Sequence, residues 1–176
     1  MIKKRGKKAQ QVFGMSFSMI LSILLIAVFI AVAFFAIRHF LEIKKCAEIG
    51  TFLEDFQDEI DRAWKSQTTE FVFKRTLPSK IQYVCFADLN KEQKGNIKDK
   101  NGESIYTELS KNAIYDHNLF FYPRRGVGDC LASTKILHIN ITGLTNPYCI
   151  EIFNKGINIQ IKKDFFDALV KVSRTE

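Results

Sequence analysis

The feature that most constrains this chain is an uncharged run from Gln10 to Ile37. A helix rises about 1.5 Å per residue, so this run is longer than the roughly 30 Å hydrocarbon core of a bilayer. We therefore predict a transmembrane helix over residues 10–38, with the lipid bilayer as its partner. The rest of the chain is long enough for one modest domain.

The positive charge of the chain is concentrated ahead of this run. The whole sequence has 26 basic and 19 acidic residues, and five of the basic ones are Lys3, Lys4, Arg5, Lys7 and Lys8. Residues 9–176 therefore have 21 basic and 19 acidic residues, a balance that gives no electrostatic footprint for nucleic acid. Basic residues stay on the cytoplasmic side of a span. We expect residues 1–9 to form a cytoplasmic tip and the domain that follows the span to lie outside the cell membrane.

The cysteines agree with this direction. All four lie beyond the span, at Cys46, Cys85, Cys130 and Cys149. An even number on the outer side is typical of disulfides in an oxidising compartment. Three pairings are possible, of which we favour Cys46–Cys130 with Cys85–Cys149. Four buried free thiols are the alternative, and the absence of a C-x-x-C motif argues against a zinc or redox site.

The start of the run carries a processing motif. A secretory signal has a shorter apolar region and a small-residue cleavage site behind it, which this run lacks. Lys7-Lys8-Ala9-Gln10, directly ahead of the apolar helix, resembles the class III signal of archaeal type IV pilin-like proteins over residues 1–65. The resemblance implies cleavage between Ala9 and Gln10, and a structural subunit whose helix joins others. Many pilins have Glu at the fifth mature position, where this chain has Gly14. An uncleaved signal anchor is therefore the alternative.

Small residues form one stripe within the span. Gly14, Ser18 and Ser22 recur every four residues and so share one helix face. Small side chains let helices approach closely in lipid, so this stripe predicts self-association. Chance alignment of common residues is the alternative.

The helix is expected to continue beyond the membrane. Residues 39–66 contain no proline, and their apolar residues recur at steps of three and four: Ile49, Phe52, Leu53, Phe56, Ile60, Ala63 and Trp64. This spacing predicts an amphipathic helix whose apolar stripe packs on its own domain. The acidic residues of the opposite face are interpreted as solvated rather than as metal ligands.

The pattern changes to strands after residue 67, in what we expect to be a disulfide-stapled, β-rich head over residues 67–176. We predict five to seven largely antiparallel strands that form a sheet against the helix, which makes the fold class α+β. The predicted strands are residues 70–76, 80–87, 118–122, 135–142, 148–153, 157–162 and 168–172. Strands 148–153 and 157–162 form the clearest hairpin. Residues 89–102 and 123–130 are predicted loops, and residues 103–112 a short helix with Ile105 and Leu109 directed inward.

The sequence offers no complete catalytic constellation. His39, His117 and His138 have no nucleophile and orienting partner that the sequence places beside them, and Gly126-Val-Gly128 lacks the rest of a nucleotide-binding motif. We therefore expect a protein that is not an enzyme and that needs no cofactor or metal. Asn140-Ile-Thr142 matches the N-glycosylation sequon, within a predicted strand. The two leading hypotheses are a pilin-like structural subunit and an uncleaved anchor that presents a binding module or an accessory subunit of a membrane complex.

Overall fold

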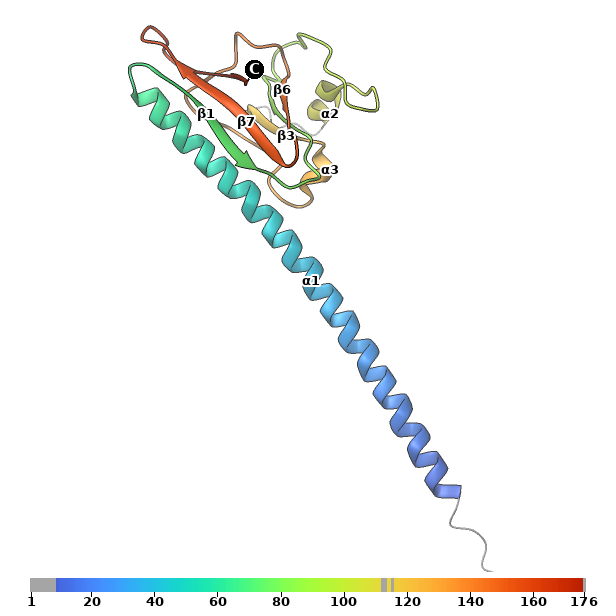
Figure 1. Ribbon diagram of the computed structural model, residues 1–176. Helices are drawn as coiled ribbons and strands as arrows, with labels where there is room; N and C mark the ends of the chain where they lie inside the picture. The colour runs from blue at the N-terminus through green and yellow to red at the C-terminus, as the bar shows by residue number, and fades with distance from the viewer. Residues whose placement is uncertain (1–8, 112–113, 115, 176) are drawn as a thin grey trace, which may run out of the picture. The chain divides into compact units, whose positions relative to one another are not determined.

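The structure is a computed structural model that describes residues 9–111, 114 and 116–175, with side chains from residue 17 onward (Figure 1). Of the predicted basic tip at residues 1–9, residues 1–8 lie outside the described residues. The chain forms two compact units that meet between Leu41 and Glu42, and each unit is described by itself. The described elements give an α+β fold with a long N-terminal helix and mostly antiparallel sheets, which confirms the predicted class.

The helix α1 runs from Ala9 to Lys65 without interruption. In the second unit its apolar stripe is buried at every predicted position except Trp64, which is 39% exposed. Packing of the stripe on its own sheets is therefore confirmed. The helix ends where the Ser66 hydroxyl donates to the carbonyl of Ala63 at 2.6 Å. The Lys163 ammonium donates to the carbonyl of Ser66 at 2.9 Å, which places a positive charge at the negative end of the helix dipole.

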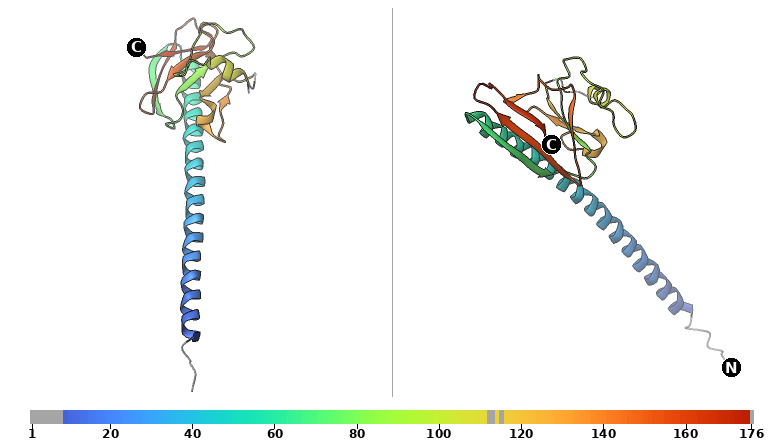
Figure 2. Two further views of the ribbon diagram at one scale, coloured as in Figure 1. Left: turned by 90° about the vertical axis from the view of Figure 1, so that its right-hand side faces the viewer. Right: turned by 45° about the horizontal axis from the view of Figure 1, so that its top comes forward.

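One sheet of the second unit has the strand order β1-β7-β8-β5. Its strands are β1 (Thr69–Thr76), β7 (Gly156–Lys163), β8 (Val170–Arg174) and β5 (Ile139–Asn140). Two views show β1 and β7 side by side, and all eight residues of each strand are paired (Figure 2). Burial alternates along β7, where Ile157, Ile159 and Ile161 face inward. This sheet therefore has one covered and one solvent-exposed face.

The other sheet has the strand order β4-β3-β2-β6. Its strands are β4 (Ser133–Thr134), β3 (Leu119–Tyr122), β2 (Tyr83–Phe86) and β6 (Tyr148–Glu151). Every residue of β3 is buried, because this sheet is covered on both faces. The helix α2 (Ile105–Lys111) belongs to the covering of the outer face through the buried residues Ile105 and Leu109, as predicted.

Five phenylalanines join the helix to both sheets. Phe52 and Phe56 of α1 stack with ring centroids 5.9 Å apart, and both meet Phe73 of β1 edge-on. Phe121 and Phe86 of the second sheet contact the same pair at 5.7 and 5.9 Å. Such pairs contribute about 0.5–1.5 kcal/mol each beyond the burial of their area. The α1 stripe is thus the centre of the main core.

Several local predictions were wrong in whole or in part. Residues 148–153 and 157–162 are joined by the tight turn of a hairpin, closed by an antiparallel bridge between Phe153 and Gly156. The pairing does not continue as a ladder, because β6 pairs with β2 and β7 pairs with β1 and β8. The expected single sheet is therefore two sheets. The predicted loop 123–130 contains a short helix, α3 (Arg124–Val127), and β4 follows it where no strand was predicted.

The predicted strand 135–142 is reduced to the two residues of β5. His138 has a φ of 61°, which takes the backbone out of the extended region and interrupts the alternation of side chains. As a result Ile136 and Ile139 are both buried and Leu137 is 50% exposed. The sequence alternates as a strand does, but the left-handed backbone at His138 changes the face to which the side chains after it point.

Candidate membrane anchor and head surface

The first unit contains the apolar part of α1. From Phe17 to Ile37 its large hydrophobic side chains are exposed, for example Phe17 and Phe29 at 70% and Phe35 at 73%. Among the described residues α1 is the single helix that is long and apolar enough to cross a membrane, by length and composition alone. An exposed apolar surface of this length fits lipid better than water.

The small-residue stripe lies on this part of the helix. The Ser22 hydroxyl donates to the carbonyl of Ser18, one turn earlier, at 2.9 Å. The hydroxyl is therefore satisfied within its own helix, as a polar group in lipid must be. Gly14 belongs to α1, as do Ala9 and Gln10 at its start. Self-association and processing stay predictions.

A cation marks the end of the apolar run. The guanidinium of Arg38 lies 4.4 Å from the centroid of the Phe34 ring. An arginine in contact with an aromatic ring, one turn apart, is typical of the boundary between a bilayer and water. Beyond it, within the second unit, Lys44 and Lys45 lie near Glu48 and Glu42.

The head is closed by two disulfides, in the pairing favoured from the sequence. Cys46 of α1 is bonded to Cys130, across 84 residues of sequence, and both residues are partly exposed. This bridge ties the first turns of the head's helix to the segment after α3. Beside it Gly128 has a φ of 69°, a left-handed conformation that glycine adopts more readily than a residue with a side chain.

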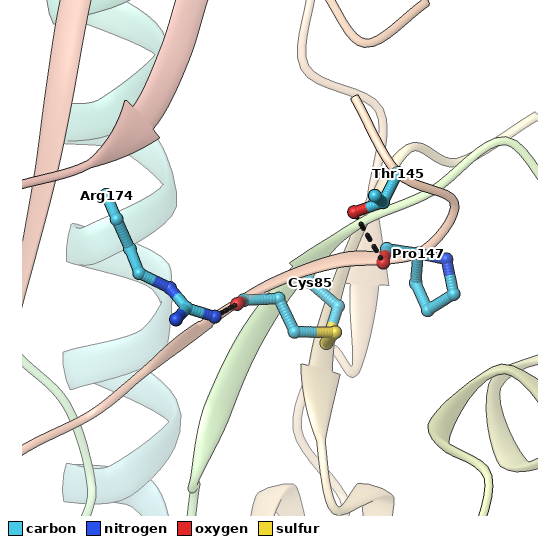
Figure 3. The surroundings of a disulfide bond; sticks show 5 residues. Cys85, Thr145, Pro147 and Arg174 are labelled. Atoms are coloured by element: carbon cyan, nitrogen blue, oxygen red, sulfur yellow. Dashed lines mark hydrogen bonds between the residues drawn. A yellow bond between two sulfur atoms is a disulfide. The ribbon is translucent and has the colours of Figure 1, made fainter. Parts of the chain in front are cut away.

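The second disulfide lies inside the head. Cys85 of β2 and Cys149 of β6 are register partners, they are bonded across 64 residues, and neither is exposed. Arg174 of β8 donates from its guanidinium to the Cys149 carbonyl at 2.7 Å, as Figure 3 shows. Thr145 and Pro147 lie on the approach to β6 in the same view. Arg174 therefore links the end of one sheet to the edge strand of the other.

The titratable cluster of the head involves His138. Its ring stacks on Trp64 of α1 with centroids 3.8 Å apart, and its Nδ1 lies 2.8 Å from an Asp61 carboxylate oxygen. Gln57 donates to the same oxygen and accepts from the Leu137 amide at 2.9 Å. The hydrogen bond with His138 is the main cause that lowers the pKa of Asp61. This cluster, Gln57, Asp61, Trp64 and His138, holds the loop before β5 against α1.

A partly buried polar contact joins β3 to the loop of residues 89–102. The Tyr122 hydroxyl donates to Asp99 at 3.0 Å. Burial and this hydrogen bond raise the pKa of Tyr122. Asp99 also accepts from the amides of Asn101 and Glu103, so it organises a turn rather than an open site.

The histidines of the head each have one side-chain hydrogen-bond partner that the structure describes. His138 pairs with Asp61, with Nδ1 2.8 Å from the carboxylate oxygen. His117 lies 2.9 Å from the Ser133 hydroxyl, with no carboxylate hydrogen-bonded to the ring within the described part of the chain. Among the described residues, no group of three or more His, Cys, Asp or Glu side chains is placed to hold a metal ion.

Asn140 is the last residue of β5 and is partly buried. Its side-chain oxygen accepts from the amide of Thr142 at 3.0 Å and from the Thr142 hydroxyl at 2.7 Å. The two polar residues of the sequon are thus joined in one turn.

The side-chain contacts of two asparagines, the partly buried Asn118 and the buried Asn146, had no signal in the sequence. The Asn118 side chain donates to the carbonyl of Ile136 and accepts from its amide, at 2.8 and 2.7 Å. The Asn146 side chain donates to the carbonyl of Asp88 at 2.8 Å and accepts from its amide at 3.0 Å. Each of these side-chain amides takes the place of a backbone hydrogen-bond partner for a residue 18 or 58 positions away in the sequence. Contacts over such distances leave no pattern in the neighbouring sequence.

Comparison with known proteins gave no match to a family model, to a curated protein or to a solved structure. What this chain does is therefore inferred from its own residues.

Proposed function

We propose that this protein is a non-enzymatic, single-pass membrane protein that holds an α+β head outside the cell and acts as a pilin-like structural subunit. One observation carries the proposal: α1 is apolar and exposed over Phe17–Ile37, and it supplies the core of the head over Ile49–Ala63. The same helix thus contains both the candidate span and the part that packs in the head.

Two independent features support the proposed orientation of the chain in the membrane. The basic residues ahead of the span favour a cytoplasmic N-terminus. The two disulfides of the head are typical of an oxidising compartment. The stripe of Gly14, Ser18 and Ser22 supports assembly with other copies in the membrane.

The experiment that tests the proposal is the intact mass of the protein extracted from its native membrane. A mature chain that begins at Gln10 supports the structural subunit. A chain that keeps Met1 or Ile2 contradicts it and leaves the uncleaved anchor, the second candidate, which the presence of Gly14 in place of Glu favours.

Topology is tested by thiol alkylation without and with reductant. We expect no reactive thiol in the non-reduced protein and four after reduction and unfolding. Four reactive thiols in the non-reduced protein would contradict an outer location of the head.

A further inference from the structure

We propose that Asn140 is an N-glycosylation site, with the oligosaccharide carried over the solvent-exposed face of the sheet β1-β7-β8-β5. The inference rests on the proposed function in one respect, because the head must lie outside the membrane to meet the transferase. It adds a covalent modification that neither the anchor nor the assembly requires.

The sequence and the strand position agree on one residue. Asn140-Ile-Thr142 is the single Asn-x-Ser/Thr sequence in the chain. β5 is one of the two edge strands of its sheet and pairs with β8 through Ile139 and Asn140. Asn140 is the last residue of that strand, and Thr142 and Gly143 are exposed in the turn that follows. The sequon is therefore at an edge, where an extended backbone ends.

The turn engages the side-chain oxygen of Asn140 and not its reactive nitrogen. Both hydrogen bonds from Thr142 end on the side-chain oxygen, at 3.0 and 2.7 Å. Throughout the described part of the chain no hydrogen bond engages the Asn140 side-chain nitrogen, Nδ2. Donors on the carbonyl oxygen polarise the amide, and the threonine hydroxyl that defines the sequon is one of those donors.

The surface beside Asn140 has room for a sugar and the polar groups to contact it. A groove of about 480 Å³ lies over the outer face of the sheet. Its walls include Asn140 and the side chains of Glu70, Gln160, Lys162, Lys171 and Ser173. Hydroxyl groups of a carbohydrate bind to carboxylate, amide and ammonium groups of this kind.

The donor is a polyprenyl-phosphate-linked oligosaccharide. The bond between the sugar C1 and the lipid phosphate oxygen breaks, and a bond between C1 and Nδ2 forms. Nδ2 gives up one proton to the transferase, and the lipid phosphate leaves with the bonding electrons. No oxidant or reductant is required.

The test is mass spectrometry of the full chain isolated from its native membrane. After reduction and trypsin digestion, residues 136–155 form one peptide, which we expect to be heavier by one oligosaccharide. Asn140→Gln and Thr142→Ala should each abolish the added mass, whereas Thr142→Ser should keep it. Asn158→Gln is the matched control, because Asn158 is exposed on β7 of the same sheet but lies outside a sequon.

An unmodified peptide overturns the inference. If the four cysteines are oxidised and the head is outside, the unmodified peptide contradicts glycosylation alone and leaves the proposed function standing. If the thiols are free and the head is inside, both proposals fail.

Discussion

At Gly126 the backbone of the segment 123–130 passes so close to Lys80 that no side chain fits. A Cβ built on Gly126 would lie 2.3 Å from the Lys80 carbonyl oxygen. We expect Gly126→Ala to lower the free energy of unfolding by about 1–3 kcal/mol, because the backbone must move apart. Denaturant unfolding followed by the fluorescence of Trp64, the single tryptophan, measures the change.

Gly50 provides the matched control for this substitution. It lies within α1, and a Cβ added there has no atom within 4 Å. Gly50→Ala should raise the free energy of unfolding by about 0.5–1 kcal/mol, because glycine in a helix interior carries an entropic cost. Shifts of the same sign in the two variants would contradict the close approach at Gly126.

The His138 cluster gives a second prediction at the scale of a residue. His138→Ala removes both the stack on Trp64 and the hydrogen bond to Asp61, and should cost about 1 kcal/mol at neutral pH. A double-mutant cycle with Asp61→Asn should show coupling between the two residues. Additive losses would contradict a direct interaction.

The pH dependence of this cluster follows from Asp61. Its pKa is lowered in the folded state from 3.8, so the stability that the carboxylate contributes is present above pH 3.8. That stability is lost as the pH falls through the lowered pKa. The difference between the wild type and Asp61→Asn should therefore shrink below pH 3.8, which a series of unfolding curves can test.

At the scale of an element, the two disulfides close loops of similar length but differ in exposure. The loop-closure entropy of the unfolded chain predicts that each disulfide stabilises the fold by roughly 4 kcal/mol. Because the two contributions are similar, we expect the exposure of each disulfide to decide which one a reductant reaches first. Cys46–Cys130 is partly exposed and Cys85–Cys149 is fully buried. We expect a dithiol under native conditions to open Cys46–Cys130 first, seen by alkylation and peptide mapping. Earlier labelling of Cys85 or Cys149 would contradict this order.

The elements also show how far sequence patterns extend. The step of three and four in α1 and the alternation in β7 were predictable, because each element has one covered and one exposed face. β3 gave only an apolar run, since both of its faces are covered. The turn at Asn154 and Lys155 was predictable from the sequence, but the turn does not determine which sheet each flanking strand joins.

The contacts of the candidate site were less predictable from the sequence than the helices and strands. The apolar run, the cysteines and the sequon are local signals. The His138 cluster was not predictable, because it joins Asp61 and Trp64 of α1 to a residue more than seventy positions away, at a φ that no alternating pattern indicates. The same holds for Arg174 at the Cys149 carbonyl.

At the scale of the whole molecule, the membrane anchor can be tested with one charge. Leu24 lies near the middle of the apolar run and is 55% exposed. Leu24→Arg should disfavour insertion by about 2.5–3.5 kcal/mol, and Leu24→Ala far less. Extraction at alkaline pH should release part of the arginine variant from membranes and none of the alanine variant. Equal retention of both would contradict a membrane-spanning position.

The burial of the α1 stripe has a consequence for the order of synthesis. Phe52 and Phe56 emerge early, yet part of their core comes from β7 and β8, about a hundred residues later. Both disulfides likewise join an early cysteine to a late one. Under the proposed topology, the aromatic stripe of α1 therefore stays uncovered until β7 and β8 have also been translocated. Factors that shield such a stripe would act within that interval.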